Sequence, residues 1–196
     1  MNTQCIGLSE DPGISPTLPS RFRRLSDGVL EQRPRSDIGA AGRHLLRNEA
    51  MTLARLAGWL APKLVEFVDG QNMVLRRQFV AGPTLSDVDR SLWSPLLADF
   101  AGNLAGVHER GLVHGDLRPE NLIVTGDGLI AIDWEHALTI GADIASRSAR
   151  AATPGYSHPR LIWGRGQVDE DLDRFSIYQM LGGENPLLED AEPVMF

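Results

Sequence analysis

The stretch HGDLRPENLIVTGDGLIAIDWE, residues 114–135, decides the fold and most of what the sequence says about function. It holds an aspartate, Asp116, an asparagine five residues later, Asn121, and a second aspartate twelve residues further on, Asp133. A carboxylate can accept the proton of an attacking hydroxyl, and Mg²⁺ prefers hard oxygen ligands such as carboxylates and amides. The spacing therefore suits phosphoryl transfer from a magnesium nucleotide, a reaction that depends on positioning and charge neutralisation.

A β-hairpin is expected inside this stretch. Two short apolar segments, 122–125 and 129–132, lie on either side of a Gly-Asp-Gly turn sequence. Asn121 and Asp133 are then expected on opposite sides of the hairpin. Arg118 lies in the same loop as Asp116 and is expected to reach the transferring phosphate and offset charge in the transition state.

The chain before this stretch predicts a small sheet with one helix. The helix is expected over residues 41–57, because Leu45, Leu46, Leu53 and Leu56 form one apolar stripe at helical spacing. Strands are expected at residues 21–25, 29–33, 64–68 and 73–80, and a Ser-Asp-Gly turn joins the first two. Residues 1–20 are expected to be irregular, with one short strand near residues 5–8.

The remaining segments predict helices and a loop. A short helix is expected at residues 84–90, a longer one at 92–109, a long loop at 141–170 and a final helix at 172–181. The order of elements predicts an α+β fold in two lobes. Residues 1–80 would form the N-terminal nucleotide-binding lobe, a small antiparallel sheet plus one helix. Residues 81–196 would form a short, mainly helical C-terminal catalytic lobe, with a nucleotide in the cleft between the two.

Composition narrows the class of protein. The 196 residues are 42% hydrophobic and 23% charged, as in an ordinary globular protein. A net charge of −7 argues against nucleic-acid binding, which usually needs a basic surface. Cys5 is the single cysteine, so no internal disulfide can form, and neither a signal peptide nor a transmembrane segment is expected. We therefore expect a cytoplasmic protein without membrane partners.

HGDLRPEN followed by IDWE resembles the catalytic loop and metal-binding motif of the protein-kinase-like superfamily. The resemblance implies a two-lobed protein-kinase-like fold and the cofactors ATP and Mg²⁺. It also implies Asp116 as the catalytic base, Asn121 and Asp133 as magnesium ligands, and His114 as a packing residue of the loop. Arg118 stands where protein-serine/threonine kinases usually carry lysine, and it keeps the positive charge.

Two further matches lie before this block. Glu49 occupies the position of the superfamily's helix-C glutamate, and its place on the apolar stripe of the 41–57 helix calls for a cationic partner. RQFVAGPTL, residues 77–85, resembles the hinge between the lobes. There the resemblance implies that backbone groups of Gln78 and Val80 meet adenine.

Two more matches follow the block. ATPGYSHPR, residues 152–160, resembles the end of a protein-kinase activation segment. DLDRFSIYQML, residues 171–181, resembles the helix that supports the catalytic loop, with Asp171 expected in the buried anchoring position. The resemblance covers roughly residues 28–186.

The sequence departs from the superfamily pattern in three places. By spacing, Glu31 takes the place of the strand lysine that binds ATP, and Arg33 or Arg35 is a candidate substitute. No G-x-G-x-x-G loop is present. The chain also stops soon after residues 171–181, so the C-terminal lobe is expected to be truncated, without the later helices that help protein kinases bind peptides.

Three hypotheses follow. The first is a compact, atypical kinase that transfers the γ-phosphate of ATP to a serine or threonine of a protein substrate. This hypothesis allows an activating protein partner. The second is a small-molecule kinase, because IDWE is more familiar in aminoglycoside- and choline-kinase-like enzymes. The third is a pseudokinase that acts as a binding module, because the strand lysine and the glycine loop are missing.

Overall fold

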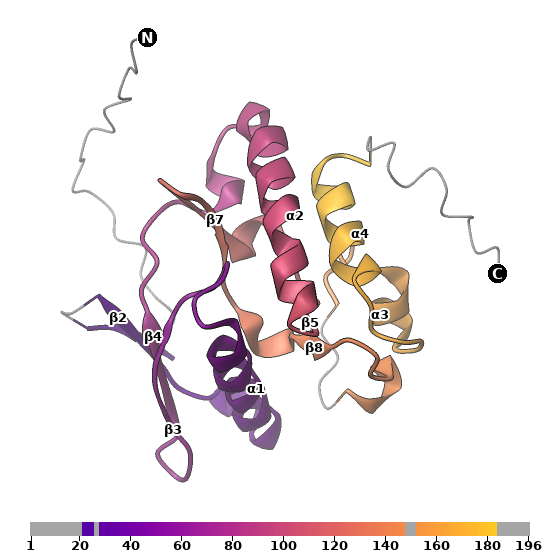
Figure 1. Cartoon of the computed structure of the whole chain (residues 1–196). Coiled ribbons are helices and arrows are strands. Elements are labelled where there is room, and N and C mark those ends of the chain that lie inside the picture. The colour runs from indigo at the N-terminus through magenta and orange to yellow at the C-terminus, as the bar shows by residue number, and fades with distance from the viewer. Residues whose placement is uncertain (1–20, 26–27, 148–151, 184–196) are drawn as a thin grey trace.

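The computed structural model describes residues 21–25, 28–147 and 152–183. The short strand expected near residues 5–8 lies outside these ranges. The chain is α+β, as predicted: a small antiparallel sheet with one helix comes first, and helices with two short strand pairs follow. Figure 1 shows the sheet and α1 on one side of α2, and α3 and α4 on the other side.

The sheet has the strand order β1-β2-β4-β3, and all neighbouring strands are antiparallel. Its strands are β1 (Phe22–Arg24), β2 (Val29–Gln32), β3 (Leu64–Val68) and β4 (Val74–Gln78). Each lies within one of the four predicted segments. Side chains alternate between the two faces of a strand. Leu75 and Arg77 of β4 therefore point to one face, where both are buried, and Arg76 points to the other.

Helix α1 (Ala40–Leu56) agrees with the predicted helix to within one residue. Its apolar stripe is buried, as expected. The helix ends at Ala57, which adopts a left-handed conformation and donates its N–H to Leu53 O at 3.0 Å. The helix packs against β3 and β4 and against η5 (Trp134–His136). It therefore connects the sheet to the segment that follows Asp133.

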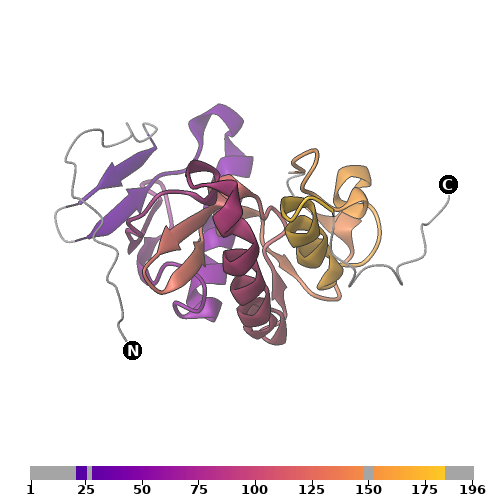
Figure 2. The ribbon, with the colours of Figure 1, turned by 90° about the horizontal axis from the view of Figure 1, so that it is seen from above.

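Helix α2 (Trp93–Glu109) is the helix around which the later elements of the chain pack. It packs against β5 (Leu112–Val113), against α4 (Asp171–Met180) and against the predicted hairpin, formed by β6 (Leu122–Thr125) and β7 (Gly128–Ala131). Figure 2 shows the hairpin and α4 on opposite sides of α2. Among the described helices, none is long and apolar enough to cross a membrane.

One hydrophobic core joins these parts. It contains Leu53 of α1, Leu75 of β4, Phe100 of α2, Leu129 of the hairpin and Trp134 of η5. Burial of a large apolar side chain stabilises a fold by roughly 1.5–3 kcal/mol. The shared core therefore fixes the sheet, α1, α2 and the hairpin relative to one another.

The segment after β4 is attached to the hairpin. Gly82 has a φ of +146°, and a Cβ built on it would lie 2.2 Å from Val124 O. Val124 N–H donates to Pro83 O at 2.9 Å. Glycine is required here because any side chain would separate the two backbones. The short helix predicted at residues 84–90 forms as two single 3₁₀ turns, η2 (Leu85–Asp87) and η3 (Arg90–Leu92).

The prediction of a long loop over residues 141–170 is partly wrong. The segment contains η6 (Ile144–Ser146) and the short helix α3 (Pro159–Trp163), and it covers a second cluster of buried residues. Pro159 stands at the first position of α3, and Gly164 ends it with a φ of +68°. A helix of five residues is too short for its apolar spacing to be seen in the sequence. The two-residue strand β8 (Leu138–Thr139), which pairs with β5, was missed for the same reason.

Candidate active site

Asp116 and Asn121 meet in a buried loop between β5 and β6. Asn121 Nδ2 donates to Asp116 O at 2.9 Å and lies 3.4 Å from Asp116 Oδ2. Both residues are buried. The amide nitrogen of Asn121 is therefore engaged in holding the loop. Its Oδ1 accepts no hydrogen bond from the described residues, which leaves that oxygen for a ligand.

Thr153 reaches the same carboxylate from a distant part of the chain. Its hydroxyl donates to Asp116 Oδ1 at 2.7 Å. The Thr153 N–H donates to Ser157 Oγ at 2.8 Å, and Ser176 of α4 donates to Tyr156 O at 2.9 Å. The TPGY segment is thus held by α4 against the carboxylate that the sequence singles out.

His114 ties this loop to the strand that precedes Asp133. Its ring is fully buried, and Nε2 lies 2.9 Å from Ile132 O. Because a carbonyl only accepts, Nε2 carries the proton, and Nδ1 can accept the Asp116 N–H at 3.3 Å. The ring also packs against the Trp134 indole, with 4.4 Å between centroids. These contacts agree with the packing role expected for His114.

The buried anchor of the loop is Asp173, and the expectation that Asp171 fills this position is wrong. Asp173 is fully buried and accepts hydrogen bonds from His114 N at 2.9 Å and Gly115 N at 3.0 Å. His108 Nε2 lies 3.2 Å from the same carboxylate. Asp171 is the first residue of α4, and its side chain is exposed. A helix turns by about 100° per residue, so a shift of two positions moves a side chain to a different face.

Asp133 occupies a strained backbone position. Its φ of 65° and ψ of 53° are left-handed, which costs a non-glycine residue about 1 kcal/mol or more. The half-buried carboxylate forms no hydrogen bond or ion pair within the part of the chain that the structure describes. Its oxygens lie within 4.8 Å of carboxylate oxygens of Glu49 and Glu135. With Asn121 Oδ1, Asp133 supplies the hard oxygen donors that Mg²⁺ takes, so these residues fit a magnesium ion.

Glu49 is fully buried at the edge of this acidic group, and it has two polar partners. Gln32 Nε2 donates to Glu49 Oε2 at 2.9 Å, and Arg77 Nε lies 3.3 Å from Glu49 Oε1. Burial raises the pKa of Glu49 to about 7; the Arg77 guanidinium opposes this rise, and the charges of Asp133 and Glu135 add to it. The predicted cationic partner is therefore present, and it is Arg77 of β4.

On β2, Gln32 is the residue that faces Glu49 of α1. The prediction that Glu31 takes the place of the ATP-binding lysine is therefore wrong by one residue. Glu31 points to the opposite face of β2, where Arg76 and Arg33 bind it at 3.0 and 3.1 Å. Alternation along a strand makes an error of one residue change the face completely. Of the two suggested substitutes for lysine, Arg33 points to the same face of β2 as Glu31. Arg33 binds Glu31, and Arg35 binds the exposed Asp37 at 3.0 Å. The hydrogen bond to Asp37 raises the pKa of Arg35, and the charges of Glu135 and Asp133 add to this rise, so Arg35 lies near the acidic group and its role as a substitute stays a prediction.

An apolar cavity of about 550 Å³ lies between the sheet and the hairpin. Leu30 lines it from β2, and Ile123 and Ile132 line it from the hairpin side. Val80 lines the cavity, as its expected contact with adenine requires. Gln78 is not among the lining residues, and its N–H donates to Lys63 O at 2.8 Å. The adenine contact of Gln78 stays a prediction.

Arg118 lies beside Asp116, as expected. Its Nε is 3.9 Å from Asp116 Oδ2 and 4.0 Å from Glu120 Oε2, and its side chain is about one-third exposed. These distances are too long for hydrogen bonds. The guanidinium therefore stays available to a phosphate near Asp116.

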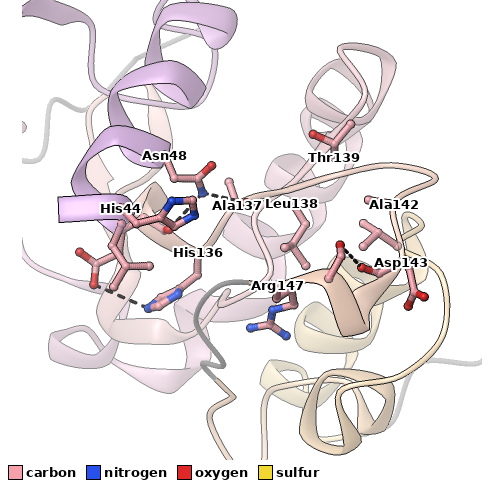
Figure 3. A pocket seen from close by; sticks show the side chains of 13 residues that line it. His44, Asn48, His136, Ala137, Leu138, Thr139, Ala142, Asp143 and Arg147 are labelled. Carbon is pink, nitrogen blue, oxygen red and sulfur yellow. Dashed lines mark hydrogen bonds and ion pairs between the residues drawn. The ribbon is translucent and has the colours of Figure 1, made fainter. Parts of the chain in front are cut away.

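A smaller cavity of about 200 Å³ lies between α1 and the segment after Asp133. Figure 3 shows His44 and Asn48 of α1 beside it, together with His136 and Arg147 from the segment after Asp133. Asn48 Nδ2 donates to the carbonyls of Glu135 and Ala137 at 3.1 and 2.9 Å. Helix α1 therefore fixes the backbone that follows Asp133. Burial lowers the pKa of His136.

Comparison with known proteins identifies the family. The model of the phosphotransferase enzyme family matches residues 22–146, which is more than half of the chain. The chain belongs to this family. The resemblance to the protein-kinase-like superfamily is thereby confirmed.

Curated relatives of this chain include bacterial and animal kinases. It is 29% identical over 185 residues to serine/threonine-protein kinase pkn2 of Myxococcus xanthus, covering 84% of this chain and 22% of that protein. It is 29% identical over 159 residues to serine/threonine-protein kinase PknL of Mycobacterium tuberculosis, covering 74% and 40%. It is 26% identical over 156 residues to citron rho-interacting kinase of Rattus norvegicus, covering 70% and 8%. The chain thus spans 8% to 40% of the length of these relatives.

The sequence did not point to four residues of this candidate site: Gln32, Arg77, Thr153 and Asp173. For Arg77 a signal was available, because Leu75 and Arg77 lie two residues apart in a predicted strand and so share one face of β4. For Thr153 the sequence offered only its place in TPGY. The contacts of Gln32 and Asp173 depend on register and helix face, which spacing alone did not resolve.

Proposed function

We propose that this member of the phosphotransferase enzyme family is an active kinase that uses Mg·ATP to phosphorylate serine or threonine hydroxyls of a protein. The observation that carries the proposal is the 2.7 Å hydrogen bond from the Thr153 hydroxyl to Asp116 Oδ1. A general base must lie within hydrogen-bond reach of the proton that it takes. Here a threonine hydroxyl carried by the peptide backbone already fits against the carboxylate, as a protein acceptor would.

Each residue has a defined part in the proposed reaction. Asp116 accepts the proton of the acceptor hydroxyl as it attacks, and Asn121 keeps that carboxylate oriented through the 2.9 Å bond to the Asp116 backbone. Asn121 Oδ1 and the Asp133 carboxylate would hold magnesium, which neutralises part of the phosphate charge when bound. Arg118 offsets the charge that develops on the transferring phosphoryl group.

The apolar cavity supports the choice of a nucleotide as donor. Its volume of about 550 Å³ lies in the range of small-molecule sites, roughly 300–1,000 Å³. Leu30 and Ile132 line it from opposite elements and can hold a flat purine ring between them. Among the described residues, nothing hydrogen-bonds the Val80 N–H at its rim, so this group can meet a ring nitrogen. The names of two relatives, both serine/threonine-protein kinases, support a protein acceptor.

A small-molecule acceptor is the second candidate, favoured by the sequence Asp133-Trp134-Glu135.

The cytoplasmic location and an activating protein partner stay predictions from the sequence.

The acceptor class is tested by following the label from [γ-³²P]ATP. The chain is incubated with Mg²⁺ and either a panel of proteins or a panel of amino alcohols and sugars, and labelled protein is hydrolysed to identify the phosphoamino acid. We expect label on phosphoserine or phosphothreonine, none on the small molecules, and loss of the signal in Asp116→Asn.

Asp127→Asn, at the exposed tip of the same hairpin, is the matched control and should retain full activity. Label on small molecules alone would replace the proposal by the second candidate. Absence of any transfer would favour the pseudokinase hypothesis.

A further inference from the structure

Arg77 is a buried cation that the predicted site did not include. It lies near the end of β4, with only 5% of its surface exposed, on the face of the sheet that points toward α1. Its neighbour Arg76 points to the opposite face and binds Glu31 and Glu66. Two adjacent arginines thus have opposite environments, and only Arg77 points inward.

The polar contacts around Arg77 are incomplete. Its Nε lies 3.3 Å from Glu49 Oε1, an ion pair in which neither atom has a hydrogen-bond partner among the described residues. Gln32 donates to the other oxygen of Glu49, and its own Oε1 is likewise buried without a partner in the described part of the chain. Buried polar groups in proteins are nearly always satisfied by protein, water or a ligand. The Gln32–Glu49–Arg77 group therefore has hydrogen-bonding capacity left for something else.

Arg77 also has the right place for a phosphate contact. It lines the apolar cavity, and among the described residues lining that cavity it alone carries positive charge. Its partner Glu49 has a carboxylate oxygen within 4.8 Å of a carboxylate oxygen of Asp133. The guanidinium thus lies between the space suited to a purine and the residues suited to magnesium. A nucleotide bound across both would bring its phosphates to this point.

Arginine can serve two partners at once. A guanidinium has five N–H donors in a planar fork, so one edge can bind a carboxylate while the other binds phosphate oxygens. In Arg77 the Nε atom faces Glu49, and the two terminal nitrogens form no hydrogen bond with the residues that the structure describes. Gln32, in the strand position that faces Glu49, is neutral and cannot offset phosphate charge.

We propose that Arg77 binds the nucleotide phosphates, and that its guanidinium on β4 replaces the lysine missing from β2. The proposal rests on the proposed function, because it requires that the cavity binds Mg·ATP. It predicts that Arg77 contributes to the affinity for the phosphates and contributes little to the affinity for the nucleoside.

Isothermal titration calorimetry with Mg·ATP and with adenosine tests this assignment. We expect Arg77→Met to weaken Mg·ATP binding by about tenfold or more, because it removes a charge-assisted contact. Its affinity for adenosine, which has no phosphates, should stay within about threefold of that of the wild type. Arg76→Met removes the neighbouring arginine from the opposite face and should change neither affinity. An equal loss for both ligands, or no loss for either, would overturn the proposal.

A charge-relocation variant covers the case in which Arg77→Met fails to fold. The double variant Gln32→Lys, Arg77→Met keeps one cation beside Glu49 but returns it to β2. We expect it to bind Mg·ATP within about threefold of the wild type. If the double variant binds adenosine as the wild type does but binds Mg·ATP tenfold more weakly, the proposal that Arg77 replaces the β2 lysine is contradicted. If the wild type binds neither ligand, the proposed function fails, and this inference fails with it. If the wild type binds Mg·ATP and Arg77→Met binds it equally well, the inference alone fails.

Discussion

Replacement of Asp173 by asparagine gives a sharp test of how the catalytic loop is held. The Asp173 carboxylate is fully buried, with donors His114 N at 2.9 Å, Gly115 N at 3.0 Å and His108 Nε2 at 3.2 Å. An asparagine keeps one oxygen acceptor and turns an NH₂ group toward at least one buried N–H. The variant thus loses hydrogen bonds to a charged acceptor and leaves a donor unsatisfied.

The expected cost follows from these contacts. A buried donor without a partner costs about 1–3 kcal/mol, and hydrogen bonds to a charged group contribute about 1.5–3 kcal/mol each. We therefore expect Asp173→Asn to lower the free energy of unfolding by about 2–4 kcal/mol, a large part of the roughly 5–15 kcal/mol of a typical domain. Asp171→Asn, two residues earlier on an exposed face of α4, should cost less than about 0.5 kcal/mol.

Urea unfolding followed by tryptophan fluorescence measures both variants. Trp134 is a suitable reporter, because it is fully buried and its indole packs on the His114 ring. With a slope of roughly 1–3 kcal/mol per molar urea, the midpoint of Asp173→Asn should fall by about 1–2 M. Equal midpoints for the two variants, or a larger loss for Asp171→Asn, would refute the assignment of Asp173 as the anchor.

Two further predictions concern the scaffold of the site. Gly82→Ala should lower the free energy of unfolding by about 2 kcal/mol or more, because the new Cβ would lie 2.2 Å from Val124 O and φ is +146°; an unchanged urea midpoint would contradict this. Arg160 binds Asp169 through two hydrogen bonds of 2.7 Å and lowers the pKa of Asp169. Since the pKa is lower in the folded state, the pair stabilises the fold above about pH 4 and loses this effect as the pH falls further. Because the pair is partly exposed, Asp169→Asn should lower the free energy of unfolding by at most about 1 kcal/mol at pH 7, and by less at pH 3. An equal loss of unfolding free energy at both pH values would argue against the ion pair.

The sequence predicted the elements that have strong periodicity or clear turn residues. The leucine stripe located α1 to within one residue, and the Gly-Asp-Gly sequence located the hairpin that separates Asn121 from Asp133. The loop around Asp116 was predictable for a related reason, because its residues are close in the chain. Local patterns carry this information whatever the rest of the fold does.

Contacts between distant parts of the chain were not predictable in the same way. Arg77 meets Glu49 only because the face of β4 that carries Arg77 packs toward α1, and a shift of one residue would present Arg76 or Gln78 instead. Thr153 reaches Asp116 across 37 positions of sequence. The identity of such partners depends on packing, which spacing within one segment does not encode.

In the proposed reaction, Asp116 accepts the proton of the acceptor hydroxyl during phosphoryl transfer from Mg·ATP. Single-turnover transfer to a protein acceptor, with Mg·ATP affinity measured on the same samples, tests this proposal most directly. We predict that Asp116→Asn lowers the transfer rate by about 10² or more while the Kd for Mg·ATP stays within about threefold of the wild type. Equal transfer rates for the two proteins, or no transfer by the wild type at saturating Mg·ATP, would contradict the proposal.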